Sequence, residues 1–551
     1  RDVAPSRGLG DVYKRQAVMV ASMFTGCGSD NGSSSAKSAS AASAASAAND
    51  TVDEDGKVNG IMYQEGLPLV DEGDYTFSIF CDDSSESGEF IMLDEFKKQT
   101  NVDVDLKIYP YETATERLNL DLNSGDYADV IGGWTLSDNA ILTYGVNQGV
   151  FIPLEDYFEK YCPNISAILD LPGVREKMTA PDGHIYTIPY VCADTTVGYS
   201  PYINTKWLEN VGMSMPTTTD EFEAVLKAFK EQDANGNGDA SDEIPFSTDP
   251  NNKHIEAMAG YFGLPMNKLG IAIQNEKVVY GGVSDTYREF LSWFHKLYAE
   301  GLVDVELYTQ DSSTWEGKGN QDLYGVSIAY GSNEFTGIPA AEERGDFDSM
   351  PVLNTDKDGI WLRDTEGLSV YRTQAVITNK AEHPEIICRW FDNAFALENG
   401  IGCNRGPVGV IVNKEDDGYH AIDTTTLSEE DQEKYSWGNL WPQSLPKYLP
   451  VDFEFVEEHP MYDEKKATEE AYEANLTKEI IPSYWIDLDK IDTFSDTNTA
   501  IKDFFEQQQA QFVCGELDID NDADWQAYVD GMYSLGLEDW VATQGIEEIA
   551  K

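Results

Sequence analysis

The chain has 551 residues, of which 99 are acidic and 38 are basic, so its formal net charge is −61. This charge excludes a nucleic-acid-binding protein, because polyanion binding needs a basic surface, and it would also repel an anionic membrane. Hydrophobic and aromatic fractions of 41% and 11% are too high for a disordered acidic chain. We therefore expect large cores, in about two to four domains or one large two-lobed fold.

The N-terminal segment resembles the end of a bacterial lipoprotein signal. A short apolar run at residues 17–26 follows two basic residues and ends at Cys27. We interpret residues 1–26 as a signal remnant, within which residues 1–16 look like a sequencing-adaptor translation. Cys27 is then the lipidation site, and the Ser/Ala-rich residues 27–73 form a flexible spacer. A random cysteine in a disordered tail is the alternative.

Alternating strands and helices are predicted from residue 74 onward. YTFSIFC at residues 75–81 is a predicted strand, and VDVDLKI at 102–108 has the period of two typical of another. Between them, the apolar spacing over residues 90–96 predicts a helix. Strand, helix and strand in this order imply a parallel βαβ unit and an α/β fold class.

A short buried strand follows a second predicted helix at residues 113–122. This strand is DVIGG at residues 129–133, and Trp134 comes directly after it. Open α/β sheets bind ligands at the carboxyl ends of their strands. Trp134 is therefore a candidate ligand-binding residue.

Two later helices have clear local signals. Thr218 and Glu221 form a capping box before apolar residues at helical spacing. A second helix begins at His383-Pro384, and its apolar stripe over residues 387–395 is interpreted as core.

The segment DANGNGDASDE at residues 233–243 has oxygen-bearing side chains at positions 1, 3 and 5, Gly at position 6 and a carbonyl at position 7. This pattern matches the first half of an EF-hand loop and predicts a structural Ca²⁺ site. Position 12 is Ile244, so Asp242 or Glu243 would have to complete the shell. The candidate ligands are Asp233, Asn235, Asn237, Asp239, Asp242 and Glu243. A turn followed by solvated acids is the alternative.

The order of several segments resembles extracellular solute-binding proteins of family 1, the receptors of bacterial ABC importers for sugars and oligosaccharides. The segments that carry this resemblance lie at residues 183–190, 202–222, 233–245, 327–332, 376–385 and 512–541. The resemblance implies a class II periplasmic-binding-protein fold, in which two α/β lobes are joined by hinge crossings and enclose the ligand in a cleft.

The resemblance also implies a division of the chain. Lobe one is expected at residues 74–191 and 368–400, and lobe two at residues 192–367 and 401–551. The crossings between the lobes are expected near residues 191–196, 363–368 and 399–405.

Sugar binding by this class of protein relies on aromatic rings that stack on pyranose faces and on polar groups that pair with hydroxyls. The predicted rings are Trp134, Tyr190, Tyr330, Trp361 and Trp441, and the predicted polar partners are Asp194, Asn333, Arg363 and Arg405. For each ring, an ordinary core position is the alternative.

We therefore expect a lipid-anchored, monomeric receptor on the extracellular face of the bacterial membrane, which delivers a sugar or oligosaccharide to the transmembrane subunits of an ABC permease. The lipid is its expected membrane attachment, because no run of eighteen apolar residues occurs. The sequence lacks HExxH, GxSxG and P-loop signatures, which favours a protein that is not an enzyme. A secreted carbohydrate-active enzyme and a surface adhesion or sensory module remain the alternatives.

Cysteine use gives little further constraint. The six cysteines beyond Cys27 lack the density and spacing of a disulfide scaffold. Cys81 falls in a predicted core strand and Cys388 on a predicted helix, so buried thiols are expected there, with at most about two disulfides in the chain.

Overall fold

The fold was determined as a computed structural model. The structure describes residues 50–83, 89–193, 196–249, 254–337, 346–365, 368–450, 453, 455–456 and 460–550. The predicted lipidation site Cys27 and the predicted ligand residue Asp194 lie outside these ranges. No helix within them is long and apolar enough to cross a membrane.

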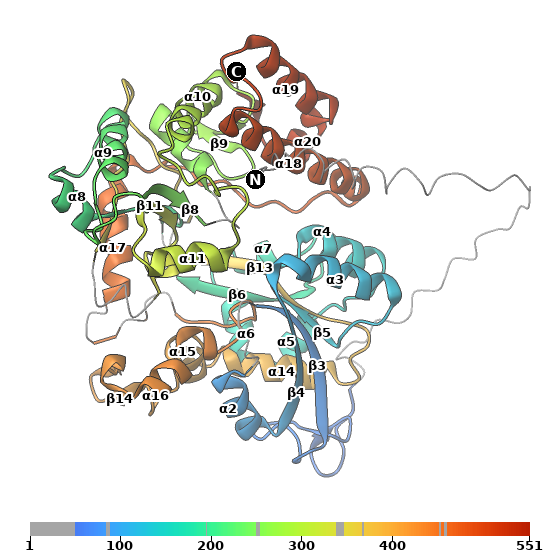
Figure 1. Cartoon of the computed structure of the whole chain (residues 1–551). Helices are drawn as coiled ribbons and strands as arrows, with labels where there is room; N and C mark the ends of the chain where they lie inside the picture. The colour runs from blue at the N-terminus through green and yellow to red at the C-terminus, as the bar shows by residue number, and fades with distance from the viewer. Residues whose placement is uncertain are drawn as a thin grey trace, which may run out of the picture. The chain divides into compact units, whose positions relative to one another are not determined.

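A five-stranded sheet combines four strands from the first 193 residues with one strand from the second half of the chain (Figure 1). Its order is β4 (Val102–Tyr109), β3 (Tyr75–Asp82), β5 (Val130–Gly132), β13 (Leu368–Ile377) and β6 (Thr187–Ala193). β3 is parallel to both β4 and β5, whereas β13 is antiparallel to β5 and β6. Helices α2 (Ile91–Thr100) and α3 (Tyr111–Ser124) make the crossovers, which confirms the predicted βαβ unit.

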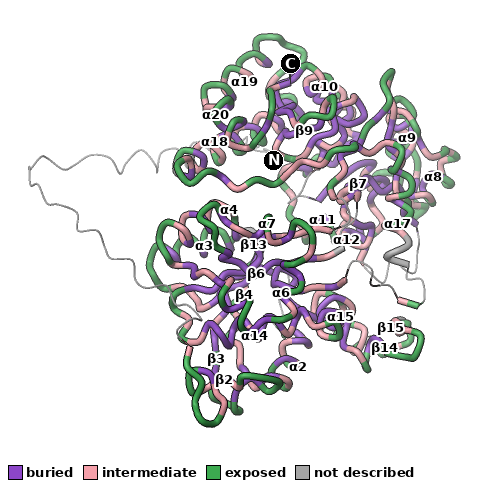
Figure 2. Tube along the Cα trace, turned by 180° about the vertical axis from the view of Figure 1, so that it is seen from behind, coloured by how far each residue is buried: buried purple, intermediate pink, exposed green. Residues whose placement is uncertain are grey.

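Both faces of this sheet are covered. Alternate side chains of β3 point to opposite faces, so the strand contributes to a core on each side. Phe77 and Ile79 join the core shared with α2 and α14 (Pro384–Ala394), while Phe80 joins the core shared with α3. Trp390 of α14 lies edge-on to Phe77 at 5.3 Å between ring centroids, as the predicted apolar stripe requires. Figure 2 shows the buried strands between helices whose outer sides are exposed.

A four-stranded sheet organises the middle of the chain. Its order is β12 (Phe347–Ser349), β7 (Ser200–Asn204), β11 (Tyr324–Ala329) and β8 (Ile244–Thr248). The associated helices are α8 (Thr205–Val211), α9 (Thr219–Glu231), α10 (Asp285–Ala299), α11 (Ser312–Asn320), α12 (Asn333–Thr336) and α17 (Pro460–Tyr472). The predicted cap of α9 is present, because the Glu221 N–H donates to Thr218 Oγ1 at 3.2 Å.

A third, three-stranded sheet and the C-terminal helices complete the described chain. The sheet contains β16 (Glu548–Ile549), β10 (Lys277–Tyr280) and β9 (Ile271–Gln274), and the helices are α18 (Ile491–Cys514), α19 (Asp522–Ser534) and α20 (Leu537–Thr543). Phe505 of α18 stacks on Tyr287 of α10 at 5.6 Å, which joins these helices to the core of the second sheet.

The remaining elements are short. They are β1 (Lys57–Val58), β2 (Met62–Tyr63), α4 (Asp138–Ala140), the π-helix η2 (Ile141–Asn147), α5 (Glu155–Tyr161), α6 (Pro163–Leu169), α7 (Val174–Met178), η3 (Ile255–Phe262), α15 (Leu397–Arg405), β14 (Val412–Glu415), β15 (Gly418–Ala421), η4 (Thr424–Thr426), α16 (Glu429–Lys434), η5 (Trp437–Asn439), η6 (Glu473–Asn475) and η7 (Leu488–Lys490).

The start of the folded chain differs from the expected arrangement. Part of the expected spacer forms the paired strands β1 and β2, and Val58, Met62, Leu69 and Val70 are buried in the core of the first sheet. These apolar side chains fix residues 58–70 to the fold, so the folded part begins before residue 74.

The segment that follows α14 also differs from the expected arrangement. Residues 399–405, where a crossing was expected, lie within α15, and Cys403 belongs to the core of the first sheet. Trp441 also joins this core, where it stacks on Trp390 at 5.6 Å. The chain thus continues to pack on the first sheet beyond residue 400, because these apolar side chains complete its core.

Cys81 and Cys388 are buried, as expected. The six cysteines within the described residues carry free thiols.

Candidate functional site

The carboxyl edge of the first sheet places the Trp134 ring in a defined position. The buried Asp82 carboxylate at the end of β3 accepts the N–H groups of Trp134 and Thr135 at 2.9 and 2.6 Å. Burial raises the pKa of Asp82, and these hydrogen bonds act in the opposite direction. A Cβ at Gly133 would lie 2.2 Å from Asp82 Oδ1, and the φ angle of 136° there is also one that favours glycine. Gly133 is therefore what lets this carboxylate fix the chain ahead of the tryptophan.

Four rings from separate parts of the chain gather at this edge, and we call them the aromatic platform: Trp134, Tyr371, Tyr190 and Trp437. Tyr371 of β13 and Tyr190 of β6 are paired in register and stack at 5.5 Å with a 17° angle between their planes. Trp134 lies edge-on to Tyr371 at 5.4 Å. Trp134 and Trp437 are 45% and 47% exposed, which leaves two large apolar ring surfaces available to a ligand.

Lys447 lies near two rings of the aromatic platform, Tyr190 and Trp437. Its Nζ lies 5.3 Å from the Tyr190 ring centroid and 5.7 Å from that of Trp437, and the side chain is 1% exposed. Gln443 accepts a hydrogen bond from Lys447 Nζ at 2.9 Å and donates one to the Trp437 carbonyl at 3.0 Å. Burial lowers the pKa of Lys447 to about 8, opposed by the nearby Cys403 and Asp83. Lys447 therefore supports the rings as a buried cation.

A second aromatic group lies at one edge of the four-stranded sheet, where β11 ends and β7 begins. Tyr330 follows β11, and Tyr199, which precedes β7, lies edge-on to it at 6.0 Å. Lys465 of α17 places its Nζ 3.8 Å from the Tyr330 ring centroid and donates to the Gly198 carbonyl at 2.8 Å. Glu334 accepts the Tyr330 N–H at 2.9 Å, and burial raises its pKa to about 7.

The remaining predicted ligand residues have other positions. Trp361 is 2% exposed and packs against Tyr261 and Tyr472, and Trp441 is fully buried, so both rings lie in cores and are left out of the candidate site. The prediction that these two tryptophans stack on a sugar is therefore wrong, because each ring is packed inside a core.

The predicted polar residues are also dispersed. Arg363 holds the C-terminal segment, since its backbone N–H donates to Thr477 Oγ1 and its Nε donates to the Thr477 carbonyl, both at 3.0 Å. Arg405 donates to the Asn404 carbonyl at 3.2 Å within the end of α15. Asn333 begins α12, close to Tyr330 in the chain.

Two platform residues, Tyr371 and Trp437, were missed from the sequence. Tyr371 is identified by its register opposite Tyr190, which sequence spacing does not reveal. Trp437 did give a usable signal, because it lies in a polar segment without helical apolar spacing, where a large ring is not needed for a core.

The predicted calcium loop contains two buried carboxylate oxygens without a partner. Asp233 Oδ2 accepts the Gly238 N–H at 3.0 Å and Glu243 Oε1 accepts the Ala234 N–H at 2.9 Å, whereas Asp233 Oδ1 and Glu243 Oε2 have no hydrogen-bond partner. Asp242 accepts hydrogen bonds from the amides of Asn235 and Asn237 at 3.3 and 2.8 Å.

Within the loop, the side chains of Asn235 and Asn237 thus contact Asp242, whereas Asp233 and Glu243 accept from backbone N–H groups. Asp239 instead accepts from Ser241. Burial raises the pKa of Glu243, whereas hydrogen bonds from the loop backbone lower it by a smaller amount. Unpartnered carboxylate oxygens beside amide oxygens fit the hard oxygen donors that Ca²⁺ prefers.

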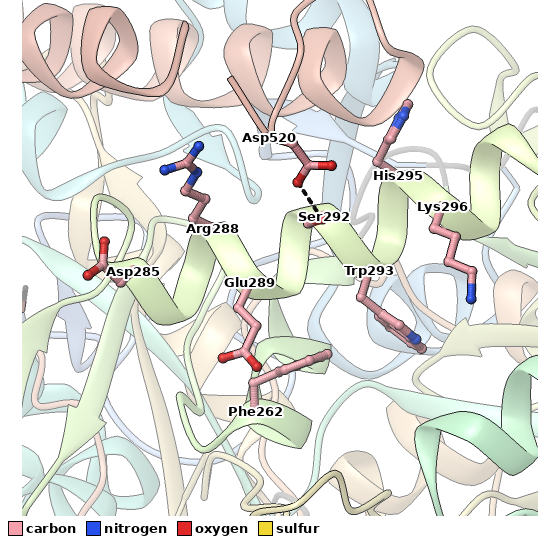
Figure 3. Close-up of a pocket in the computed structure, with 9 residues that line it drawn as sticks. All are labelled: Phe262, Asp285, Arg288, Glu289, Ser292, Trp293, His295, Lys296 and Asp520. Carbon is pink, nitrogen blue, oxygen red and sulfur yellow. Dashed lines mark hydrogen bonds between the residues drawn. The ribbon is translucent and has the colours of Figure 1, made fainter. Parts of the chain in front are cut away.

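A shallow hollow of 790 Å³ runs along α10 but shares no residue with either aromatic group. Figure 3 shows its lining side chains spread to both sides of the helix, with Arg288 and His295 on one side and Glu289 and Trp293 on the other. Ser292 donates to Asp520 at 2.9 Å. This is the surface of an exposed helix, and we assign no ligand to it.

Comparison with known proteins places the chain in a group of binding proteins. It is 31% identical over 413 residues to the fructooligosaccharide ABC transporter substrate-binding protein FusA of Streptococcus pneumoniae, covering 72% of this chain and 71% of that protein. It is 28% identical over 280 residues to lipoprotein LipO of Bacillus subtilis, covering 49% of this chain and 52% of LipO.

Solved structures agree with this placement. The structure of S. pneumoniae FusA in complex with kestose matches with a TM-score of 0.74 at 26% identity, over 85% of this chain and 98% of that chain. The alginate-binding protein AlgQ2 without calcium ion matches with a TM-score of 0.69 at 22% identity, over 88% of this chain and 99% of that chain, and so supports the periplasmic-binding-protein fold. The sequence profile described as bacterial extracellular solute-binding protein matches residues 83–400. The chain therefore belongs to the bacterial extracellular solute-binding protein family.

Proposed function

We propose that this protein is the sugar-binding receptor of an ABC importer and that its ligand is an oligosaccharide. The observation that carries the proposal is the aromatic platform, where two exposed tryptophans accompany a stacked tyrosine pair at the edge of a mixed sheet where the parallel strands β3 and β5 end. Pyranose and furanose rings present apolar faces that stack on such surfaces. The similarity to FusA, named for fructooligosaccharides and solved with kestose, supports the same ligand class.

We further propose that the two large sheets belong to two lobes that close around the ligand. In this arrangement the aromatic platform binds one face of the sugar, and the second aromatic group, with Tyr330 and Lys465, binds it from the other lobe. Hinge closure of this kind needs a ligand that binds the closed state better than the open state. β6 ends at the first expected crossing, near residues 191–196, and β13 begins at the second, near residues 363–368. Because these two strands are paired, both crossings leave the sheet at the same place, which supports a hinge there.

Calcium binding is a separate part of the proposal. The oxygens that would hold Ca²⁺ are those of Asp233, Asn235, Asn237, the carbonyl of Asp239, and Asp242 or Glu243. The two unpartnered buried oxygens, on Asp233 and Glu243, favour a cation at this loop. A solved structure of FusA is described as an EF-hand mutant, which is consistent with such a loop in that relative. The ion would order the loop, and no step of ligand binding passes through it.

The expected location and partners follow from the family. We propose that the mature protein is attached by a lipid on Cys27 to the extracellular face of the membrane and that it acts as a monomer. There it would deliver its sugar to the transmembrane subunits of an ABC permease. The relative LipO is named as a lipoprotein, which supports the anchor.

Binding without turnover is the outcome that distinguishes this receptor from a secreted carbohydrate-active enzyme. The test is a thermal-shift screen of mono- and oligosaccharides, kestose included, followed by chromatography of the sugar after long incubation. We expect a concentration-dependent rise in melting temperature for at least one oligosaccharide and an unchanged sugar. Stabilisation by no sugar, or products from a bound sugar, would refute the receptor assignment.

A further inference from the structure

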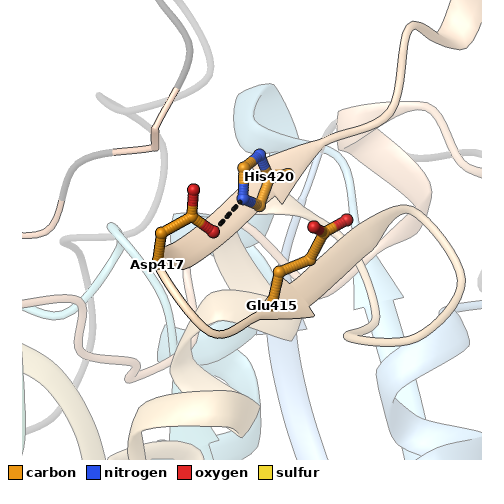
Figure 4. A group of neighbouring side chains, drawn as sticks. All are labelled: Glu415, Asp417 and His420. Carbon is orange, nitrogen blue, oxygen red and sulfur yellow. Dashed lines mark hydrogen bonds and ion pairs between the residues drawn. The ribbon is translucent and has the colours of Figure 1, made fainter.

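The hairpin formed by β14 and β15 brings three side chains of metal-binding chemistry together outside both aromatic groups and the calcium loop. They are Glu415, Asp417 and His420, and one potential ligand atom from each lies within 4.8 Å of the other two. Figure 4 shows His420 between the two carboxylates. The His420 Nε2 to Asp417 Oδ1 distance is 3.0 Å.

The strand register explains why these side chains meet. His420 pairs with Asn413 across the hairpin, and Glu415, two residues beyond Asn413, therefore lies on the same face as His420. Asp417 belongs to the two-residue turn between the strands. The next residue, Gly418, has a φ angle of 147°, and a Cβ there would lie 2.9 Å from a Val456 methyl group. The turn that presents Asp417 thus depends on glycine.

Charge favours a cation at this face, where Glu415 and Asp417 are exposed and His420 is half-buried. Neither Glu415 nor Asp417 forms an ion pair with a lysine or arginine among the described residues. The neighbouring Lys414 pairs instead with Glu398 at 2.7 Å, and its Nζ lies 5.6 Å from the Tyr419 ring centroid. The His420 side chain is only 15% exposed, so its ring is already held in position before a ligand arrives.

We propose that Glu415, Asp417 and His420 form a binding site for a divalent transition-metal ion of the Zn²⁺ type. Donor atoms about 2.1 Å from a tetrahedral ion lie about 3.4 Å apart, so a movement of a few tenths of an ångström would let an ion enter between His420 Nε2 and Asp417 Oδ1, which are 3.0 Å apart. One imidazole nitrogen and two carboxylate oxygens are ligands for zinc-like ions, whereas Ca²⁺ takes only oxygen. This site is independent of the proposed sugar and calcium sites.

The proposal is tested by titrating Zn²⁺ into the full chain, first saturated with Ca²⁺, by calorimetry. The variants are His420→Ala and Glu415→Gln, and the matched control is His184→Ala. His184 also contacts a carboxylate, on Glu155 at 2.5 Å, but no third ligand joins that pair among the described residues.

We expect the wild type and His184→Ala each to bind one equivalent of Zn²⁺. His420→Ala should lose this binding, and Glu415→Gln should bind Zn²⁺ at least tenfold more weakly. Co²⁺ in place of Zn²⁺ should show visible absorption bands in the wild type that change in His420→Ala. Equal zinc stoichiometry and affinity in the wild type and both hairpin variants would overturn the site. So would an absence of zinc binding by the wild type.

Discussion

Asp82 and Gly133 together fix the position of the Trp134 ring. Gly133→Ala would place a methyl group where the Asp82 carboxylate lies, at a φ angle that L residues rarely adopt. We expect a loss of about 3 kcal/mol in the free energy of unfolding. Sugar affinity should also fall, because the backbone that presents Trp134 must shift. Urea unfolding and calorimetry measure the two effects.

Gly149→Ala provides the control for backbone conformation alone. Gly149 also has a positive φ angle, 63°, but no atom lies within 4 Å of its Cβ position. This variant should lose only about 1 kcal/mol and keep its sugar affinity. Equal losses of stability in the two variants would show that the contact with Asp82 contributes nothing.

Lys447 makes stability depend on pH in a defined direction. Burial lowers its folded-state pKa to about 8, whereas the ordinary value is 10.5. Between these pH values the unfolded chain binds more protons at this residue than the folded chain, so the free energy of unfolding rises with pH. Lys447→Met removes this contribution.

Unfolding by urea at several pH values from 7 to 10.5 should therefore show the wild type gaining stability relative to Lys447→Met above pH 8. The gain should approach the order of 3 kcal/mol near pH 10.5 and be absent below pH 8. Parallel pH profiles for the two proteins would contradict a buried, charged Lys447.

At the scale of elements, sequence patterns predicted the strands of the first βαβ unit and the helices after residues 113, 218 and 383, but not how distant segments pair. The period-two pattern of β4 and the apolar spacing of α14 were sufficient, because each reflects one buried face. The pairing of Tyr371 with Tyr190 joins strands about 180 residues apart and is set by tertiary packing. Trp441 could not be assigned to a core from its local sequence, because its partner Trp390 belongs to another element.

The loop between α9 and β8 gives a prediction at the same scale. In chelator-treated protein, Ca²⁺ should raise the melting temperature, since an ion that binds only the folded state at 100 times its Kd adds about 2.7 kcal/mol. Asp233→Asn should abolish the rise, because Asp233 supplies a buried carboxylate oxygen without another partner. Asp239→Asn should keep it, because the expected ligand at position 7 is the backbone carbonyl.

An unchanged melting temperature in the wild type on calcium addition would reject this site. Loss of the effect in Asp239→Asn as well would show that the side chain, and not the carbonyl, is the ligand at position 7.

At the scale of the whole molecule, the order of several segments along the chain predicted the fold through the family resemblance. The boundaries between the two expected lobes, however, depended on packing that the sequence does not show. Cys403, Trp441 and Leu445 enter the core of the first sheet, whereas Val412 of the hairpin between them belongs to a separate small cluster. Those apolar residues are compatible with either lobe when read from the sequence alone. The expected ligand rings divided in the same way, into exposed Trp134 and buried Trp361.

The proposed anchor is also a property of the whole molecule. With a complete signal peptide restored, the wild type should fractionate with bacterial membranes, and Cys27→Ser should be released from them. The physical reason is that the lipid supplies the apolar surface for membrane attachment. Membrane association that persists in Cys27→Ser would show that lipidation at this residue is not the attachment.

The most direct test of the receptor account is calorimetric titration of the stabilising oligosaccharide into Trp134→Ala and Trp437→Ala. Each variant removes one exposed platform ring, which should cost on the order of 1–3 kcal/mol, or about ten- to a hundredfold in Kd, without a change in melting temperature. Tyr533→Ala, which removes a ring of 42% exposure on α19, is the control and should bind as the wild type does. Wild-type affinity in both tryptophan variants would contradict sugar binding at the aromatic platform.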